Sequence, residues 1–328
     1  MKGGAGALGY NPSFGAAWGP HKVSTLMALD FTGRVAIVTG AGGGLGRLHA
    51  LALAARGARV MVNDFGGSRD GTGGSVSAAQ AVADEITAAG GQALAHGASV
   101  TDLAGVEDMV AQTVAAWGRV DILVNNAGIL RDKSFSKMSV EDFRAVVDVH
   151  LMGAVHCCKA VWPHMIAQNH GRIVMTTSSS GLFGNFGQSN YGAAKMALVG
   201  LMQTLSIEGA KYDIRVNCLA PTAATRMTEG LLPPEVLAVL QPEAVVPALL
   251  VLVSADAPNR AIACAGAGTY EAAHVTLTKG VHLGSGADVP ERLAEAWDQV
   301  SDRSGDSVPA SGAAQGTNEV GQALGRSR

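Results

Sequence analysis

The chain has 328 residues, of which 48% are apolar and 16% are charged, with a formal net charge of −3. This length suffices for one large core or two modest ones. The small negative charge argues against a basic surface for nucleic acid or for an anionic membrane, so we expect a small-molecule protein with neither partner.

Both ends of the chain differ in composition from its middle. Residues 1–27 are rich in Gly and Ala without a continuous apolar core, so we expect a flexible extension rather than a signal peptide, with Met27 as a possible true start. Residues 301–328 hold few bulky apolar side chains, which predicts a disordered tail. The folded unit is therefore expected at 28–300.

The cysteines give no sign of a metal site. Their positions lack metal-ligand spacing and lie in or beside apolar runs, which favours reduced core thiols in a cytoplasmic protein: Cys157, Cys158, Cys218 and Cys264. The longest apolar run, 245–253, is interrupted by Pro247 and is far shorter than the roughly 20 residues of a membrane span.

Short apolar runs alternate with longer helical patterns through the middle of the chain. Strands are predicted at 35–39, 59–63, 92–96, 120–124, 172–176 and 214–219. Helices are predicted at 47–56, 75–89, 103–117, 140–168 and 190–211, and a further one at 290–300. Near-continuous apolar strands separated by helices predict an α/β fold with a doubly wound, Rossmann-like parallel sheet in a single domain.

A glycine-rich turn at 39–46 follows the first predicted strand and precedes a helix. Glycines such as Gly40, Gly44 and Gly46 permit a tight turn and let the backbone approach a pyrophosphate at the helix N-terminus. Asp64 ends the second strand, where a carboxylate can bind an adenosine ribose. That carboxylate would repel a 2′-phosphate, so NAD is favoured over NADP; an ordinary turn and a solvated aspartate are the alternatives.

Two further groups of residues follow later strands. Asn126, Ala127 and Gly128 close the fourth strand, where small residues let the backbone approach a cofactor and an amide can tie strands together. Tyr191 and Lys195 stand one helical turn apart, so a nearby ammonium would lower the pKa of the phenol. Ser178 is expected beside that phenol, and the set indicates hydride transfer to or from a carbonyl.

Together these motifs resemble the short-chain dehydrogenase/reductase family. The matching elements are the turn at 39–46, the Asn-Asn-Ala-Gly run at 125–128, Ser178, and Tyr191 with Lys195. Within the family, the stretches 62–67, 126–135 and 184–188 are most similar to the (3R)-hydroxyacyl-CoA dehydrogenase unit of peroxisomal multifunctional enzymes.

The resemblance implies a role for each matching residue. Tyr191 would be the general acid/base, Ser178 would bind the substrate oxygen, and Lys195 would bind the nicotinamide ribose. The implied cofactor-binding residues are Gly40, Gly44, Leu45, Gly46, Asp64, Ser99, Val100, Asn126, Ala127, Gly128, Tyr191, Lys195, Pro221 and Thr222.

Three positions depart from the commonest family pattern. His150 stands where many members have an asparagine that helps to hold a water on the lysine, so a packed histidine and a proton-relay role both stay open. Ser99 replaces an aspartate, and Thr222 replaces a glycine. These two changes affect the expected binding geometry and leave the reaction class unchanged.

The substrate is expected to be a (3R)-3-hydroxyacyl-CoA. The alternatives are a hydroxysteroid or a steroid side-chain CoA ester, reduction of a 3-oxoacyl thioester, and an NAD-binding sensor without turnover. An apolar pocket is one expectation for five residues, with core packing as the other: Phe135, Leu182, Phe183, Phe186 and Met227. The family commonly forms homodimers or homotetramers, which we expect here too.

Overall fold

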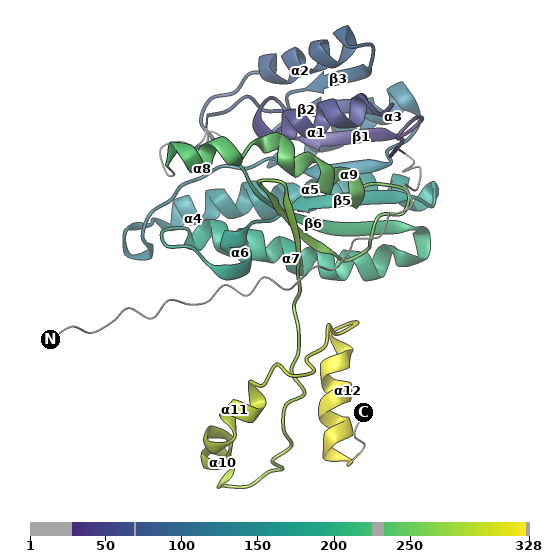
Figure 1. Cartoon of the computed structure of the whole chain (residues 1–328). Helices are drawn as coiled ribbons and strands as arrows, with labels where there is room; N and C mark the ends of the chain where they lie inside the picture. Colours follow the sequence, from purple (N-terminus) through teal and green to yellow (C-terminus); the bar gives the residue numbers. More distant parts are fainter. Residues whose placement is uncertain (1–27, 69, 225–232, 326–328) are drawn as a thin grey trace, which may run out of the picture.

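An eight-stranded sheet organises the described part of the chain. The computed structural model describes residues 28–68, 70–224 and 233–325, and within them the strand order is β3-β2-β1-β4-β5-β6-β7-β8 (Figure 1). The strands are β1 Val35–Thr39, β2 Arg59–Asn63, β3 Gln92–His96, β4 Ile122–Asn125, β5 Gly171–Thr176, β6 Ile214–Thr222, β7 Ile262–Gly266 and β8 Thr269–Ala273. All neighbours pair in parallel except β7 and β8, which are antiparallel.

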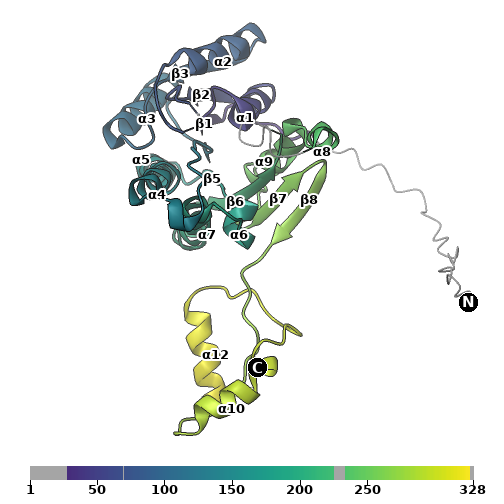
Figure 2. The same cartoon turned by 90° about the vertical axis from the view of Figure 1, so that its left-hand side faces the viewer.

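Helices cover both faces of this sheet, which confirms the doubly wound prediction. In β1, Ala36 and Val38 face one apolar cluster and Ile37 faces the other, because side chains alternate along a strand. The first cluster packs under α1 Gly44–Ala54, α2 Ser77–Ala88 and α9 Val246–Leu252, and the second under α3 Leu103–Trp117, α5 Gly153–Ala167 and α7 Ser189–Gly209. Figure 2 shows the two layers on either side of the strands.

Shorter helical elements complete the sheet domain. They are η1 Phe135–Lys137, α4 Val140–Val147, the π-helical turn η2 Asp148–Met152, α6 Ser179–Phe183, η3 Ala210–Tyr212, α8 Pro234–Val239 and η4 Pro242–Val245. The continuous helix Val140–Ala167 is long and apolar enough to cross a membrane by length and composition. It instead contacts α3 and α7 within the fold, as a core helix does.

The end of the sheet differs from the sequence prediction. The sequence did not predict β7 and β8, whose runs are short and rich in Ala and Gly. They form because β6 offers a parallel edge to β7, and the turn at Ala267 and Gly268, both with positive φ, returns the chain as β8. The predicted strand at 120–124 begins two residues later, at Ile122.

An arm of residues 274–325 leaves β8 and stands away from the sheet (Figures 1 and 2). It contains α10 Val289–Glu295, α11 Trp297–Val300 and α12 Ala313–Ala323, so the helix predicted at 290–300 is present as α10 and α11. The prediction of disorder for 301–328 is corrected for residues 301–325. Ser307 bridges to Leu277, and Gln322 Nε2 in α12 donates to the Lys279 carbonyl at 2.7 Å.

The regular structure of residues 301–325 does not depend on a buried apolar core. Helix α12 buries none of its residues, and five of its eleven residues are Ala or Gln, which are good helix formers, while two are Gly. Side-chain amides of α12 bond to the rest of the arm. The helix is therefore present although it lacks the bulky apolar side chains that the sequence prediction required. Residues 1–27 and 326–328 lie outside the described residues.

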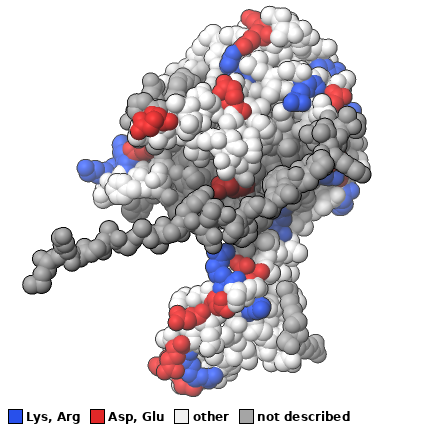
Figure 3. Space-filling view, in the orientation of Figure 1, with Lys and Arg blue, Asp and Glu red and all other residues white. Residues whose placement is uncertain are grey.

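Charged side chains of both signs are interspersed on the face shown in Figure 3, and many of them lie on the arm. This face presents no large patch of a single sign, in keeping with the small net charge. Electrostatics on this face therefore give no support for a polyanionic partner.

Candidate active site

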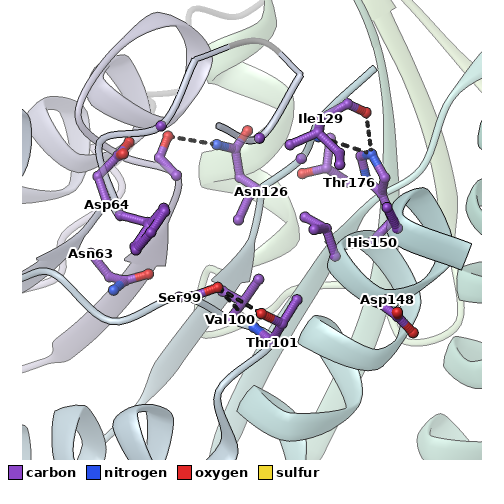
Figure 4. Close-up of a pocket in the computed structure, with 18 of the residues that line it drawn as sticks. Asn63, Asp64, Ser99, Val100, Thr101, Asn126, Ile129, Asp148, His150 and Thr176 are labelled. Carbon is purple, nitrogen blue, oxygen red and sulfur yellow. Dashed lines mark hydrogen bonds between the residues drawn. The ribbon is translucent and has the colours of Figure 1, made fainter. Parts of the chain in front are cut away.

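A cleft of about 760 Å³ opens at the carboxyl ends of the parallel strands (Figure 4). Strands β1 and β4 are neighbours there although β2 and β3 intervene in sequence, and ligands of open α/β sheets bind at such a reversal of strand order. Thirteen of the predicted site residues line the cleft: Gly40, Gly44, Leu45, Asp64, Ser99, Val100, Asn126, Ala127, Gly128, His150, Tyr191, Lys195 and Pro221.

The glycine-rich turn leaves no room for side chains at two of its positions. A Cβ at Gly46 would lie 2.2 Å from the Gly40 carbonyl oxygen, and one at Gly40 would lie 2.7 Å from Ala127 Cα. Gly46 therefore serves the packing of the turn and does not line the cleft. Helix α1 begins here with no side-chain cap, so its first amides can face an anion such as a pyrophosphate.

Asn126 connects this turn to the end of β4. Its Nδ2 donates to the carbonyls of Thr39 and Gly40, each at 3.0 Å. Thr39 Oγ1 in turn accepts the amides of Asn126 and Ala127 at 3.0 and 3.1 Å. These bonds fix two cleft-lining segments to each other, as expected for an amide that ties neighbouring strands.

Asp64 lies at the end of the cleft formed by β2 (Figure 4). Its carboxylate accepts the amide of Gly42 at 2.8 Å and that of Gly66 at 2.6 Å. A carboxylate oxygen has two lone pairs, so Asp64 retains acceptor capacity for ribose hydroxyls. Among the lining residues that the structure describes, the cationic side chains are Arg131 and Lys195, which do not adjoin Asp64 in the chain.

Ser99 and Thr222, two positions that depart from the commonest family pattern, lie differently with respect to the cleft. Ser99 and Val100 line the cleft, and the Ser99 hydroxyl lies 2.8 Å from that of Thr101, within the same loop (Figure 4). Thr222 does not line the cleft and instead pairs with Gly266 in the sheet, although Pro221 beside it does line the cleft. Thr222 therefore lies beside the cleft and not in its lining.

Tyr191 and Lys195 line the cleft at the end formed by β5, and Ser178, which is not among the lining residues, lies beside Tyr191. Lys195 Nζ lies 5.4 Å from the centroid of the Tyr191 ring and donates to the Thr176 carbonyl. Ser178 Oγ accepts the Ser180 amide at 3.1 Å. The helix α7 thus presents the phenol and the ammonium on one face, as their spacing predicts.

The expected effect of Lys195 on the tyrosine pKa is corrected in this structure. Burial raises the pKa of Tyr191, the nearby Asp132 carboxylate also raises it, and the bond with Ser178 lowers it. Burial also lowers the pKa of Lys195 to about 7, so the ammonium is itself partly deprotonated near neutral pH.

His150 lies in the π-helical turn η2, and its ring stands against that of Tyr191. Its Nε2 is 2.8 Å from the Ile129 carbonyl oxygen and 3.2 Å from the Ile129 amide nitrogen, whereas its buried Nδ1 has no hydrogen-bond partner among the described residues. A Cβ at Gly128 would lie 2.3 Å from the ring. Burial, followed by the charge of Lys195, holds the pKa of His150 well below its usual range.

The predicted apolar pocket is not seen among the described residues. Phe135, Phe183 and Phe186 are exposed, Leu182 does not line the cleft, and Met227 lies outside the described residues. Sequence reasoning instead missed Asn63, Ile129 and Thr176, which line the cleft (Figure 4). Asn63 and Thr176 are the last residues of β2 and β5, a position that could have revealed them.

A doubly wound sheet with this turn and this Ser, Tyr and Lys set defines an oxidoreductase that uses a nicotinamide dinucleotide. Residues 34–235 match the family model described as short chain dehydrogenase, so the chain belongs to that family. It is 48% identical over 273 residues to a short-chain type dehydrogenase/reductase of Mycobacterium tuberculosis, covering 83% of this chain and 95% of that protein.

Two solved structures resemble the fold. The full-length peroxisomal multifunctional enzyme type 2 of Drosophila melanogaster has a TM-score of 0.75 at 38% identity, over 91% of this chain and 50% of that chain. A 7α-hydroxysteroid dehydrogenase complexed with NADH and 7-oxo glycochenodeoxycholic acid has a TM-score of 0.65 at 30% identity, over 73% and 95%. The chain spans only 25–64% of the curated multifunctional relatives that it matches.

Proposed function

We propose that this protein oxidises a (3R)-3-hydroxyacyl-CoA to the 3-ketoacyl-CoA, with NAD as the electron acceptor. The observation that carries the proposal is that Tyr191 and Lys195, with Ser178 beside the tyrosine, lie at one end of a cleft whose other end holds Asp64. The thioester part of the proposal rests on the similarity to multifunctional enzymes of peroxisomes.

Tyr191 would accept the proton of the substrate hydroxyl. Ser178, whose hydroxyl lowers the pKa of the neighbouring phenol, would donate a hydrogen bond to the substrate oxygen and hold it beside that phenol. Bound nicotinamide would supply the acceptor for the hydride that leaves the carbinol carbon. Lys195 would bind the nicotinamide ribose. When its amine is protonated, the positive charge would also favour the ionised form of Tyr191.

The preference for NAD is supported by Asp64. Its carboxylate is held by two backbone amides and would repel a 2′-phosphate at the ribose. We expect Asp64→Ala to raise the KM for NAD by about tenfold or more, and to narrow the preference for NAD over NADP. Steady-state rates with each cofactor at saturating alcohol test this.

A hydroxysteroid is the second candidate substrate. It is favoured by the structural similarity to the 7α-hydroxysteroid dehydrogenase, whose structure holds NADH and a bile acid conjugate. An acyl thioester and a steroid both present a secondary alcohol, so the Ser178 and Tyr191 pair serves either. The surroundings of that pair therefore decide the substrate, not the pair itself.

The deciding experiment follows NADH absorbance with purified protein, NAD and parallel substrates. The substrates are (3R)- and (3S)-hydroxyacyl-CoA and a hydroxysteroid, with NADP as a cofactor control. Turnover of the (3R) thioester alone supports the proposal. Turnover of the steroid with neither thioester oxidised would overturn the substrate and leave the reaction class in place.

Tyr191→Phe separates catalysis from cofactor binding. We expect turnover to fall at least about a thousandfold, while the affinity for NADH, measured by fluorescence titration, changes less than about threefold. A wild-type protein that binds NADH and oxidises none of these alcohols would favour an NAD-binding sensor.

We also propose that the protein is a homodimer or homotetramer in the cytoplasm. Light scattering of the purified protein tests the size of this oligomer.

A further inference from the structure

Two loops lie side by side at the catalytic end of the cleft. One follows β4 and contains residues 131–133, and the other, residues 185–188, leads into the first turn of α7, which contains Asn190. The amide of Lys133 donates to the Gly187 carbonyl at 2.9 Å, and Asn190 Nδ2 donates to the Arg131 carbonyl at 3.1 Å. Asn190 Oδ1 also accepts the amide of Tyr191 at 2.7 Å, so the junction between the loops adjoins the catalytic tyrosine.

Gln188 forms the side-chain part of this junction. Its Nε2 donates to Asp132 Oδ2 at 2.7 Å, and its Oε1 accepts both Ser180 Oγ at 2.8 Å and Asn185 Nδ2 at 3.0 Å. The amide is therefore used as a donor on one side and as an acceptor on the other. Neither a carboxylate nor an ammonium offers both functions, whereas an amide does.

The contacts continue to the catalytic residues. The backbone amide of Ser180, whose hydroxyl bonds Gln188, donates to Ser178 Oγ at 3.1 Å. Ser178 lies close enough to Tyr191 for its hydroxyl to lower the pKa of the phenol. Hydrogen bonds therefore connect Asp132 through Gln188 to Ser180, and the Ser180 amide to Ser178, the residue beside Tyr191.

We propose that Gln188 is a positioning residue, which clamps the loop after β4 to the Ser178 turn and so holds Ser178 in line with Tyr191. The clamp crosses between segments that the fold supplies separately, from the ends of β4 and β5 and from the start of α7. It acts on the Ser178 and Tyr191 pair and so rests on the proposed function, although it holds for any secondary alcohol oxidised there.

Asp132, the anionic end of the clamp, has a second effect, on the pKa of Tyr191. The charged and titratable groups facing Tyr191 are Lys195 at 5.4 Å from the ring centroid, His150 edge-on to the ring, and Asp132. Asp132 is the one carboxylate among these groups, and its charge raises the pKa of the phenol. The exposed position of Asp132 makes this effect small and sensitive to salt.

The test compares Gln188→Leu with Asn185→Ala. Both variants remove a hydrogen bond at Gln188 Oε1, but only Gln188→Leu cuts the connection between Asp132 and Ser180. We expect Gln188→Leu to lower kcat by about tenfold to a hundredfold, because small displacements of reacting groups cost that much, and Asn185→Ala to stay within about twofold. NADH affinity and the melting temperature serve as folding controls and should match the wild type.

A pH profile supplies the readout that a merely structural role would not move. Oxidation needs ionised Tyr191, so kcat/KM rises with pH through the tyrosine pKa. Asp132→Asn removes the charge that raises this pKa, so the rising limb should move to lower pH, by less at high salt. Asn185→Ala should leave the limb in place.

Two results would overturn the proposal. They are turnover of Gln188→Leu within about twofold of wild type, and equal losses in Gln188→Leu and Asn185→Ala. An unmoved limb in Asp132→Asn would overturn the second, electrostatic effect alone. The assay uses whichever alcohol the wild type oxidises. A steroid-specific enzyme would therefore refute the proposed substrate while the clamp is still tested.

Discussion

The imidazole of His150 stands edge-on against the ring of Tyr191, with the ring centroids 5.1 Å apart and the planes at 86°. The same histidine bonds the Ile129 backbone through Nε2, and its ring covers the backbone of Gly128. It therefore packs against the tyrosine ring and also lines the cleft. This arrangement favours the packed role over the proton relay, since the lowered pKa keeps the ring neutral near pH 7.

We expect His150→Asn to lower kcat about tenfold without moving the pH limb of kcat/KM. The loss follows from removing an edge contact with Tyr191, and the fixed limb follows because a neutral ring does not titrate between pH 6 and 9. Rates measured across that range at fixed ionic strength check this. A limb near the ordinary histidine pKa of about 6.5 that disappears in the variant would show that His150 titrates during turnover.

Lys195→Met should abolish turnover and stabilise the fold. Burial lowers the pKa of Lys195 to about 7 from its usual 10.5, so the unfolded state binds the additional proton between these values. The cost of burying the amine is therefore greatest at and below pH 7 and declines towards pH 10.5. We expect the variant to gain about 1–3 kcal/mol in the free energy of unfolding at pH 7.

Urea unfolding of both proteins at pH 7 and pH 9.5 measures this difference. The advantage of Lys195→Met should be smaller at pH 9.5. Lys195→Arg serves as the control, because it keeps a charge and should give no gain. Equal stability of Lys195→Met and wild type at pH 7 would contradict the expected burial cost.

The sequence predicted those parts of the site that depend on local order along the chain. The glycine-rich turn, Asp64 and the tyrosine–lysine pair each follow from a short pattern next to a strand or within a helix. The contacts of Gln188 with Asp132, and of His150 with Ile129, join residues far apart in sequence, and no periodicity encodes them. The edge strand β8 was missed for a similar reason, since pairing with β7 and not composition stabilises it.

The arm shows the limit of composition most clearly. A segment with few bulky apolar residues was expected to be disordered, yet α12 forms from helix-favouring residues and is fixed by side-chain amides. The sequence also did not predict which side chains surround the substrate. Phe183 and Phe186 follow a strand in the sequence, as buried aromatic residues do elsewhere, but they are exposed in the structure.

Removing the imidazole of His49 should reduce the loss of stability in acid. His49 is fully buried in α1, and neither ring nitrogen has a hydrogen-bond partner among the described residues. Burial lowers its pKa to about 3, whereas the unfolded histidine titrates near 6.5, so the histidine favours unfolding progressively as the pH falls below 6.5. At pH 5 this amounts to about 2 kcal/mol.

His49→Leu tests this expectation by chemical denaturation at pH 7.5 and pH 5. At pH 7.5 the variant should match or exceed the wild type, because two unpaired polar atoms leave the core. Between the two pH values it should lose about 2 kcal/mol less than the wild type does. His164→Leu, at a partly buried position near the end of α5, is the control and should keep the wild-type slope.

Gly66→Ala should damage the loop that holds Asp64, whereas Gly73→Ala should not. Both glycines have positive φ, at +74° and +77°, so both substitutions carry the same backbone strain, of order 1 kcal/mol. A Cβ at Gly66 would lie 1.9 Å from the Ser75 carbonyl oxygen, but one at Gly73 would have nothing within 4 Å. The difference between the variants therefore isolates the steric clash.

That clash should weaken cofactor binding, because the Gly66 amide donates to Asp64 at 2.6 Å and would have to move. We expect Gly66→Ala to bind NADH at least about tenfold more weakly, and Gly73→Ala to stay within about twofold, by fluorescence titration. A common loss in both variants would mean that backbone strain, and not the contact with Ser75, governs the loop. Equal wild-type affinity in both would mean that the Asp64 carboxylate does not depend on Gly66 for its position.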